Sequence, residues 1–286
     1  MKYRFIESCE ADLPVQAVCR NLGVSRSAYY QWRQHRPGQR MQEDVELSRI
    51  IEIEFHKHRR TYGSPRMRDR LRELGRRHSR RRIRRLMEAN GLIARKIAGF
   101  VMTTQADPSH QPAPNVLNRE FTADGPNRKW VSDITYIPTD EGNLYLAATM
   151  DLWSRMIVGW AVRESMQVSL VQQAFDMAVR HRWPNPGLLH HSDRGSQYTA
   201  QGFRQQLHQH DMVESHSRKG NVWDNAAMES FFSSLEMELL RNKRFRTKAE
   251  AIQEVFIYIE VFYNRQRIHT ALGGRSPAQF EAEGGN

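Results

Sequence analysis

The chain has 286 residues and a mass of 33.5 kDa, a length that favours two or more domains because single domains usually run about 100–200 residues. Hydrophobic residues make up 39% of it, and no apolar run approaches the roughly 18 residues that a membrane span needs. We therefore expect neither a membrane-spanning nor a wholly disordered protein. Only Cys9 and Cys19 are present, which argues against a disulfide scaffold and favours reduced thiols in a cytoplasmic protein.

The positive charge is concentrated at the front of the chain. The formal net charge is +11, and residues 1–120 hold 25 Lys and Arg against 13 Asp and Glu. Residues 121–286 hold 18 basic and 19 acidic residues, so they are close to neutral. Such asymmetry is typical of a front end that binds a polyanion, joined to a near-neutral back end.

The first predicted unit is a helix-turn-helix within residues 1–40. Apolar spacing over 13–34 predicts two short helices, the first broken by Gly23 and the second capped by Ser25. A generic helical hairpin would show the same spacing. If the unit binds DNA, its second helix enters the major groove. The candidate DNA contacts are then Arg26, Tyr30 and Arg33.

Residues 41–98 are predicted to form a second basic helix-turn-helix-like domain. Its first helix is expected over 43–58. Ser64 is expected to cap a second helix, and Ser79 a third.

Thirteen arginines lie from Arg59 to Arg85, and the only acids within that stretch are Asp69 and Glu73. Because this many positive charges repel one another unless a polyanion neutralises them, we expect contact with nucleic acid rather than a solvated charged face. The candidate DNA contacts here are Arg66, Arg68, Arg81, Arg82, Arg84 and Arg85.

A proline-containing linker is expected over 99–127, and residues 128–286 change character. Three strand-prone runs over 128–162 predict an antiparallel meander. The remaining elements are expected as a helix over 166–181, a strand over 187–193, a helix near 199–210, a strand near 212–215, a helix over 224–240 and a last helix over 247–263. This order is that of an α/β, RNase H-like fold, with a mixed five-stranded sheet and a helical C-terminal extension.

Three acids stand out in this back half. Asp133 lies in a strand-prone run, where a buried carboxylate is costly unless it is paired or bound to a metal. Asp193 ends the next predicted strand, and Glu229 lies about one turn into a predicted helix, with 35 residues between these two. Hard divalent cations take oxygen ligands, so converging carboxylates could hold them. Surface or capping acids are the alternative interpretation.

Several sequence motifs strengthen the first interpretation: WVSDITYI, HSDRGSQYTA, SRKGNVWDNAAMESFF and YNRQRIHTALGGRSPAQF, with CRNLGVSRSAYYQW and RTYGSPRMRDRL nearer the front. Together they resemble the catalytic protein of bacterial insertion-sequence transposases of the insertion sequence three family, encoded by the second reading frame. The resemblance covers nearly the whole chain. It implies an integrase core with a DDE site made of Asp133, Asp193 and Glu229.

The resemblance also implies the chemistry and the partners. Mg²⁺ or Mn²⁺, two ions when DNA is bound, would be held by the three acids. The enzyme would bind terminal inverted repeats of double-stranded DNA, cleave the phosphodiester at the element end and join the 3′-OH to target DNA. A homo-oligomer on DNA, a possible frameshift fusion to an upstream product, and a place at the bacterial nucleoid are implied as well. The alternatives are a DNA-binding regulator with an inactive core and a nuclease that does not join strands.

Two further features bear on DNA contact. Arg218, Lys219 and Asn221 lie in the predicted loop before the helix of Glu229 and are candidate contacts, with a solvated loop as the alternative. Many relatives carry a lysine seven residues after the third acid, where this chain has Glu236. Either another cation such as Lys243 replaces that lysine, or Glu236 pairs with a basic residue, or the contacts with the element end differ.

Overall fold

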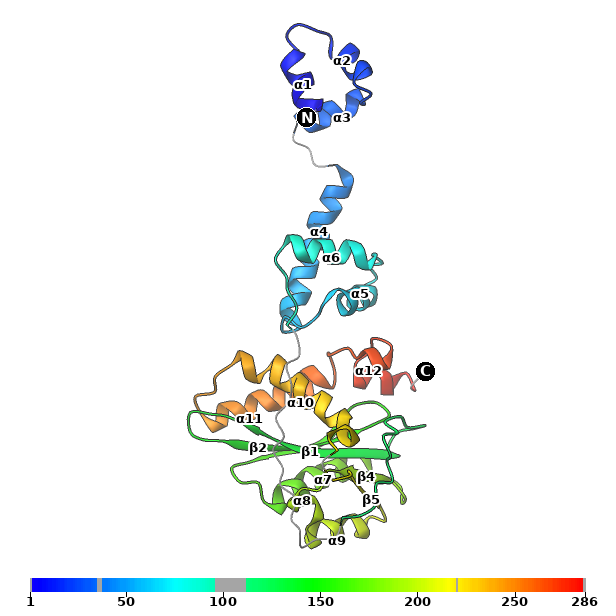
Figure 1. Cartoon of the computed structure of the whole chain (residues 1–286), viewed down its shortest axis with the longest axis vertical. Helices are drawn as coiled ribbons and strands as arrows, with labels where there is room; N and C mark the ends of the chain where they lie inside the picture. The colour runs from blue at the N-terminus through cyan, green and yellow to red at the C-terminus, as the bar shows by residue number, and fades with distance from the viewer. Residues whose placement is uncertain (1, 35–37, 96–111, 220, 285–286) are drawn as a thin grey trace.

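The structure is a computed structural model that describes residues 2–34, 38–95, 112–219 and 221–284. Three short helices, three further helices and a five-stranded sheet with its helices follow one another in chain order (Figure 1). Across the described residues, no helix has the length and apolar character needed to cross a membrane.

The first three helices form the predicted helix-turn-helix and one element that was not predicted. They are α1 (Lys2–Cys9), α2 (Val15–Asn21) and α3 (Arg26–Arg33). Gly23 takes a φ of 62° between α2 and α3, a conformation that glycine adopts without steric cost. Ser25 caps α3 by accepting a hydrogen bond from the Ala28 amide. Tyr29 is fully buried in the small core that the three helices share.

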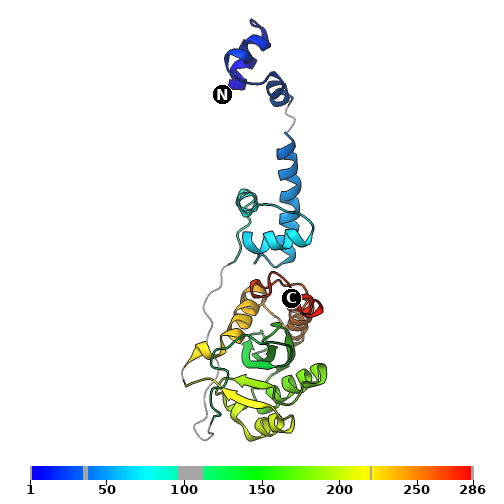
Figure 2. The same cartoon turned by 90° about the vertical axis from the view of Figure 1, so that its right-hand side faces the viewer.

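The second helical group consists of α4 (Gln39–Lys57), α5 (Ser64–Glu73) and α6 (Arg80–Ala89), with α4 as the long helix of Figure 2. Ser79 caps α6 as predicted, accepting a hydrogen bond from the Arg82 amide. The predicted cap of α5 was wrong by one residue, because Gly63 occupies the cap position and Ser64 is already helical. Leu47, Ile51 and other apolar side chains of the three helices share one core.

The back half contains a mixed five-stranded sheet, as predicted. Its strands are β1 (Lys129–Ile137), β2 (Leu144–Asp151), β3 (Ile157–Arg163), β4 (Leu189–Ser192) and β5 (Val213–His216). The spatial order is β3-β2-β1-β4-β5, with the first three strands antiparallel and β4 and β5 parallel to β1. β1 therefore lies at the centre.

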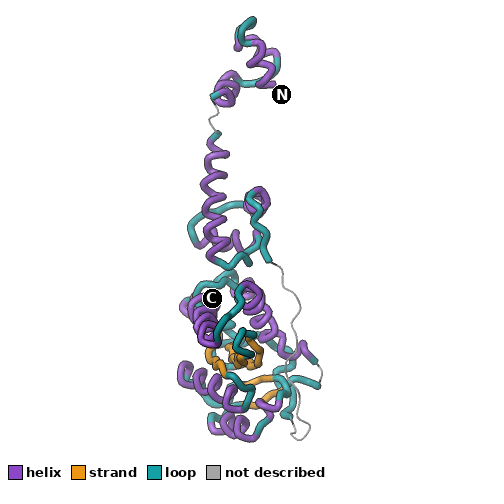
Figure 3. The backbone as a smooth tube through the Cα atoms, turned by 90° about the vertical axis from the view of Figure 1, so that its left-hand side faces the viewer, coloured by secondary structure: helices purple, strands orange, loops and turns teal. Residues whose placement is uncertain are grey.

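Helices cover both faces of the sheet (Figures 1 and 3). One face packs on α7 (Val168–Arg182), α8 (Ser196–Thr199) and α9 (Gln201–Gln209). The other packs on α10 (Ala226–Glu238), α11 (Lys248–Phe256) and the π-helical turns over Ile257–Tyr263. Alternate residues of β1 pack into the cores on opposite faces of the sheet. Trp130 and Ile134 face α7, whereas Val131 and Ile137 face α10. The remaining short elements are the 3₁₀ turns η1 (Val222–Asn225), η2 (Leu240–Asn242) and η4 (Thr270–Leu272), and the helix α12 (Pro277–Ala282).

The second helical group also contacts the sheet domain. The Tyr62 hydroxyl accepts a hydrogen bond from the Ile268 amide at 2.8 Å, and the Ile268 side chain joins the core of α4, α5 and α6. The Arg59 guanidinium lies 5.0 Å from the ring centre of Phe262 and 5.5 Å from that of Tyr258. The loop before α5 therefore connects the second helical group to the sheet domain through direct contacts.

The later part of the predicted linker packs on β5. The Ala113 amide donates to Nδ1 of His216 at 2.9 Å, and the Val116 and Leu117 amides donate to the Ser215 hydroxyl at 2.9 and 3.2 Å. Residues 112–119 therefore form a strap along the sheet edge. The earlier part, 99–111, lies outside the described residues, and the predicted domain boundaries at 40, 98 and 127 stay predictions.

Candidate active site

The sheet topology places Asp133 and Asp193 side by side. β1 and β4 are parallel neighbours in which Ser132 pairs with Ser192, so the residues that follow both partners leave the paired region together. Asp133 is 8% exposed, and its Oδ1 accepts a hydrogen bond from the Ile134 amide at 2.8 Å. Oδ1 of Asp193 accepts from the Gly195 amide at 2.9 Å. Backbone amides thus orient both carboxylates.

Glu229 approaches from the helix that covers this face. It lies in the first turn of α10 and is half-buried. The helix is fixed against β1 by Asn225, whose side-chain amide donates to the Ser132 carbonyl at 3.1 Å. Asn225 is the residue that directly precedes α10, so this bond holds the first turn of the helix, which includes Glu229, over β1, the strand that carries Asp133.

Electrostatics link the three acids. Burial raises the pKa of Asp133 well above its ordinary value, and the negative charges of Asp193 and then Glu229 raise it further, against the opposing effect of the Ile134 hydrogen bond. Burial also raises the pKa of Glu229. Asp133 thus lies next to Asp193 and within electrostatic reach of Glu229. Such perturbed carboxylates in a shared site are typical of functional residues.

The chemistry of the three acids suits a hard divalent cation. All their donors are carboxylate oxygens, and a cation between them would relieve their mutual repulsion. In the arrangement seen across the described residues, no three His, Cys, Asp or Glu side chains converge closely enough to hold an ion. The three carboxylates are thus suitable ligands for such a cation, but their side chains would have to move closer together to bind it.

A tyrosine that sequence reasoning missed lies beside the acids. Tyr198, in α8, is 1% exposed, and its hydroxyl has no hydrogen-bond partner among the residues that the structure describes. Burial and then the charges of Asp133 and Asp193 raise its pKa well above the ordinary value. A buried hydroxyl without a partner costs about 1–3 kcal/mol.

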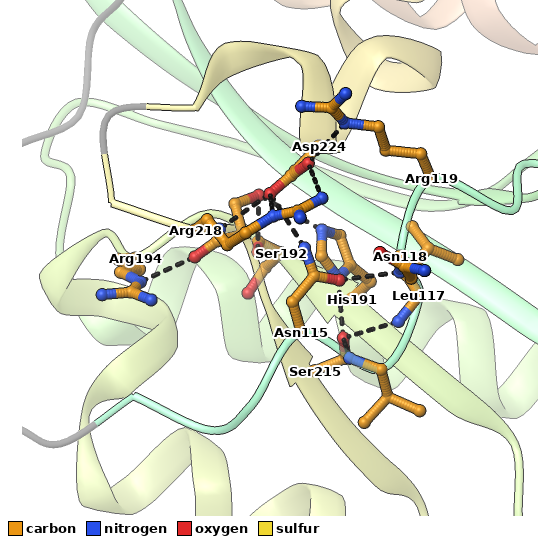
Figure 4. A network of polar contacts seen from close by, with 12 residues as sticks. Asn115, Leu117, Asn118, Arg119, His191, Ser192, Arg194, Ser215, Arg218 and Asp224 are labelled. Carbon is orange, nitrogen blue, oxygen red and sulfur yellow. Dashed lines mark hydrogen bonds and ion pairs between the residues drawn. The ribbon is translucent and has the colours of Figure 1, made fainter.

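The loop before α10 is organised by Asp224, which is fully buried (Figure 4). Its carboxylate accepts hydrogen bonds from the amide, Nε and Nη2 of Arg218, each at 2.9 Å. It also accepts from Nε of Arg119 at 2.9 Å and from the side-chain amide of Asn115 at 2.8 Å. The Arg218 guanidinium is the largest of the effects that hold the pKa of Asp224 well below its usual range.

The other candidate contacts in this loop differ in environment. Lys219 is exposed, whereas Asn221 is half-buried and its side-chain Oδ1 has no hydrogen-bond partner within the described part of the chain. Glu236 forms an ion pair with Arg241 at 3.1 Å, which is one of the alternatives expected for this position. Lys243 is paired with Glu250 and Glu254 and does not face Glu236 as its partner.

The candidate contacts of the first helix-turn-helix lie on α3. Arg26 and Tyr30 are exposed, the latter by 38%. Arg33 donates to Glu10, and Tyr29 donates to the same carboxylate at 3.0 Å. Contact of Arg26, Tyr30 and Arg33 with DNA stays a prediction.

The arginines of the second helical group are more neutralised than the sequence suggested. The expectation that only Asp69 and Glu73 oppose them was wrong, because α4 supplies further acids. Arg82 and Arg85 both pair with Asp44 of α4. The other pairs join Arg82 to Glu43, Arg84 to Glu88, Arg68 and Arg72 to Asp69, Arg70 to Glu54 and Glu73, and Arg76 to Glu46.

Two of the predicted contacts in this group have other surroundings. Arg66 lies half-buried over the Tyr62 ring, at 5.9 Å from its centre. Arg81 is exposed and has no acidic partner within the described part of the chain. The sequence could not show the α4 pairs, which join residues 16 to 41 positions apart. Contact of these arginines with DNA stays a prediction.

Family comparisons agree with this architecture. Residues 123–222 and 229–283 match descriptions of an integrase core domain, residues 42–97 match an HTH-like domain, and residues 1–60 match a transposase helix-turn-helix family. Among solved structures, a chain of the simian T-cell lymphotropic virus intasome in complex with PP2A regulatory subunit B56 gamma aligns with a TM-score of 0.48 at 15% identity, covering 68% of this chain and 66% of that one.

Curated relatives match over nearly the full length. The insertion element IS600 31 kDa protein of Shigella sonnei is 44% identical over 263 residues, covering 92% of this chain and 97% of the relative. Transposase InsF for insertion sequence IS3A of Escherichia coli (strain K12) is 38% identical over 283 residues, covering 98% of both. The chain therefore belongs to the IS3 family of insertion-sequence transposases, which are polynucleotidyl transferases that contain helix-turn-helix domains and an integrase core.

Proposed function

We propose that Asp133, Asp193 and Glu229 are the catalytic acids of this transposase and hold two Mg²⁺ or Mn²⁺ ions when DNA is bound. The observation that carries the proposal is the parallel pairing of β1 with β4, which places the buried Asp133 beside Asp193, under the first turn of α10 that carries Glu229. Two bound ions would activate the attacking oxygen and stabilise the departing one.

The protein's own groups prepare this site. The Ile134 and Gly195 amides fix the planes of the two aspartates, which limits their rotation before DNA arrives. Burial of Asp133 strengthens every charge interaction there because water is excluded. Glu229, half-buried in the first turn of α10, is less enclosed than Asp133 and has room to move towards a ligand.

The reaction we propose has two displacements. In the first, a water oxygen bonds to the phosphorus at the element end and the bond from phosphorus to the 3′ oxygen breaks, which leaves a 3′-OH. In the second, that 3′-OH attacks a phosphodiester of the target strand, and the leaving oxygen takes the proton. Neither step needs a covalent protein intermediate, so the acids position and stabilise rather than react.

Recognition of the element ends is assigned to the two helical domains. Their matches to helix-turn-helix families and the basic character of residues 1–120 support binding of terminal inverted repeats. Joining two ends calls for more than one catalytic chain, so we propose a homo-oligomer on DNA. We also propose that the chain acts on the bacterial chromosome in the cytoplasm, alone or fused by frameshifting to an upstream product.

The test is a cleavage and joining assay on a duplex that carries the element end, with magnesium present. Asp133→Asn should lose both products by on the order of a thousandfold or more, because several kcal/mol of transition-state stabilisation are removed. Affinity for the duplex should be unchanged. Asp140→Asn is the matched control, since Asp140 is an exposed acid just beyond the C-terminal end of β1, paired with Arg244. Full joining by Asp133→Asn would refute the assignment.

A further inference from the structure

Two arginines from distant parts of the chain meet at one buried carboxylate. Arg119 comes from the strap along β5 and Arg218 from the loop before α10, and both donate to Asp224 (Figure 4). Asp224 is fully buried, yet the two arginine side chains are 46% and 48% exposed. The carboxylate thus anchors the inner edge of each guanidinium and leaves the rest of both at the surface.

The donors that remain are suited to a phosphate. Arg119 uses only Nε towards Asp224, and Arg218 uses Nε and Nη2, so three of their terminal nitrogens have no acceptor among the described residues. Two guanidiniums and one carboxylate leave a surplus positive charge. Guanidinium groups bind phosphate oxygens through fixed, planar donors, and their pre-ordering lowers the entropy lost on binding.

This cluster lies beside the three acids. The Ser217 amide donates to the carbonyl of Ser192 at 3.0 Å, and Asn225 donates to that of Ser132 at 3.1 Å. Ser192 and Ser132 directly precede Asp193 and Asp133 in the chain. The loop that carries Arg218 and Asp224 is therefore attached to β4 on one side and to β1 on the other, in each case directly before an aspartate of the candidate active site.

A third arginine extends the basic surface. Nε of Arg194 donates to the Ser217 carbonyl at 2.6 Å, so this side chain lies along the same loop. Arg194 follows Asp193 directly. Basic groups thus continue from the Asp224 cluster towards the acids.

We propose that Arg119 and Arg218, held in place by Asp224, form a phosphate clamp that binds the DNA backbone next to the catalytic acids. The clamp rests on the proposed function in taking DNA as the ligand of this site. It also assigns a role to the strap, which sequence reasoning treated as a linker: the strap supplies one of the two phosphate-binding side chains.

The test measures binding of the full chain to a fluorescently labelled random-sequence duplex, in EDTA and at several salt concentrations. Arg119→Ala and Arg218→Ala should each lower the slope of log affinity against log salt by about 0.9 and weaken binding at 0.1 M salt by roughly eightfold. Arg119→Lys should keep most of the slope. Arg244→Ala is the matched control, because Arg244 is an exposed arginine of the same domain that is also paired with a single aspartate. Its slope should not change.

Slopes of Arg119→Ala and Arg218→Ala equal to that of Arg244→Ala would overturn the clamp. Asp224→Asn should weaken binding as the two arginines do, and thermal unfolding of each variant shows whether it is folded. The arginine variants decide the matter if Asp224→Asn does not fold. Because EDTA removes the chemistry, loss of the clamp is separate from loss of the proposed function, which the Asp133→Asn assay reports.

Discussion

Helix α10 buries one glutamate beside a cation near its C-terminal end and turns another towards two aspartates in its first turn. Glu238 accepts hydrogen bonds from Nε of Arg267 at 3.0 Å and from the Tyr258 hydroxyl at 2.9 Å, and all these groups are buried. Glu229 instead shares its surroundings with Asp133 and Asp193. Within the described residues, no lysine or arginine is paired with Asp133.

This difference indicates that Glu238 stabilises the fold, whereas Glu229 is available to bind a ligand. The buried ion pair of Glu238 and Arg267 holds the C-terminal segment against α10. A buried cluster of like charge costs stability and persists where a ligand compensates it. The predictions below test this contrast between the two ends of α10 and their neighbours.

The largest expected effect on stability is at the C-terminal end of α10, where Glu238 pairs with Arg267. Glu238→Ala leaves the Arg267 guanidinium buried without its carboxylate and should lower the free energy of unfolding by about 3–5 kcal/mol, measured by urea denaturation. Glu236→Ala, in the same helix, removes an exposed partner of Arg241 and should change stability by less than about 1 kcal/mol. Equal effects of the two variants would remove the contrast.

Below neutral pH the sheet under the acids should weaken. His191 is fully buried between the Ser215 and Ser217 hydroxyls, and burial lowers its pKa to about 4. The unfolded chain binds the proton first, so the stabilisation is complete above pH 6.5 and is lost as the pH falls towards 4. At pH 5 the loss is roughly 2 kcal/mol.

His191→Gln is the variant that isolates this titration. Between pH 7 and pH 5 its unfolding free energy should fall by roughly 2 kcal/mol less than that of the wild type. An identical fall in both proteins would assign the acid sensitivity to other groups.

Near the first turn of α10, the removal of the Asp133 charge should stabilise the protein. The pKa of Asp133 is raised in the folded state, so the metal-free protein loses stability as the pH rises through that pKa. Asp133→Asn does not titrate, and at pH 8 in EDTA it should be more stable than the wild type by about 1–2 kcal/mol. Thermal unfolding in EDTA and in magnesium measures this, and magnesium should raise the wild-type midpoint only. A less stable Asp133→Asn in EDTA would contradict the account.

The smallest effect concerns two tyrosines that differ in their hydroxyl partners. Tyr198→Phe removes a buried hydroxyl that has no partner and should raise the free energy of unfolding by about 1 kcal/mol. Tyr258→Phe removes the donor to Glu238 and should lower it. Urea denaturation of both variants gives the two signs, and a loss of stability in Tyr198→Phe would show that its hydroxyl already has a partner.

Local patterns carried much of the fold. The order of strands and helices followed from residue periodicity, and the Ser25 and Ser79 caps were placed correctly. The strand context of Asp133 marked that residue, but the full set of Asp133, Asp193 and Glu229 was implied by the resemblance to the insertion sequence three family. The order of elements and the two caps depend on short-range chain geometry, which sequence reports directly.

Long-range partners could not be predicted in this way. The acids of α4 that neutralise the arginines of α6 depend on how two helices pack, as does the meeting of Arg119 with Asp224 across 105 positions. Asp224 showed only as the start of a helix, because its role is set by partners on two separate segments. The signal available was its position close to Arg218 and Lys219 in the same loop.

The most direct test of the central claim is calorimetric titration of Mn²⁺ into the full chain bound to an uncleaved duplex. The account predicts binding that saturates near two ions per chain and is lost in Asp133→Asn and Asp193→Asn, while Asp140→Asn binds as the wild type does. Unchanged Mn²⁺ binding by both cluster variants would contradict the assignment of the metal ions to these acids.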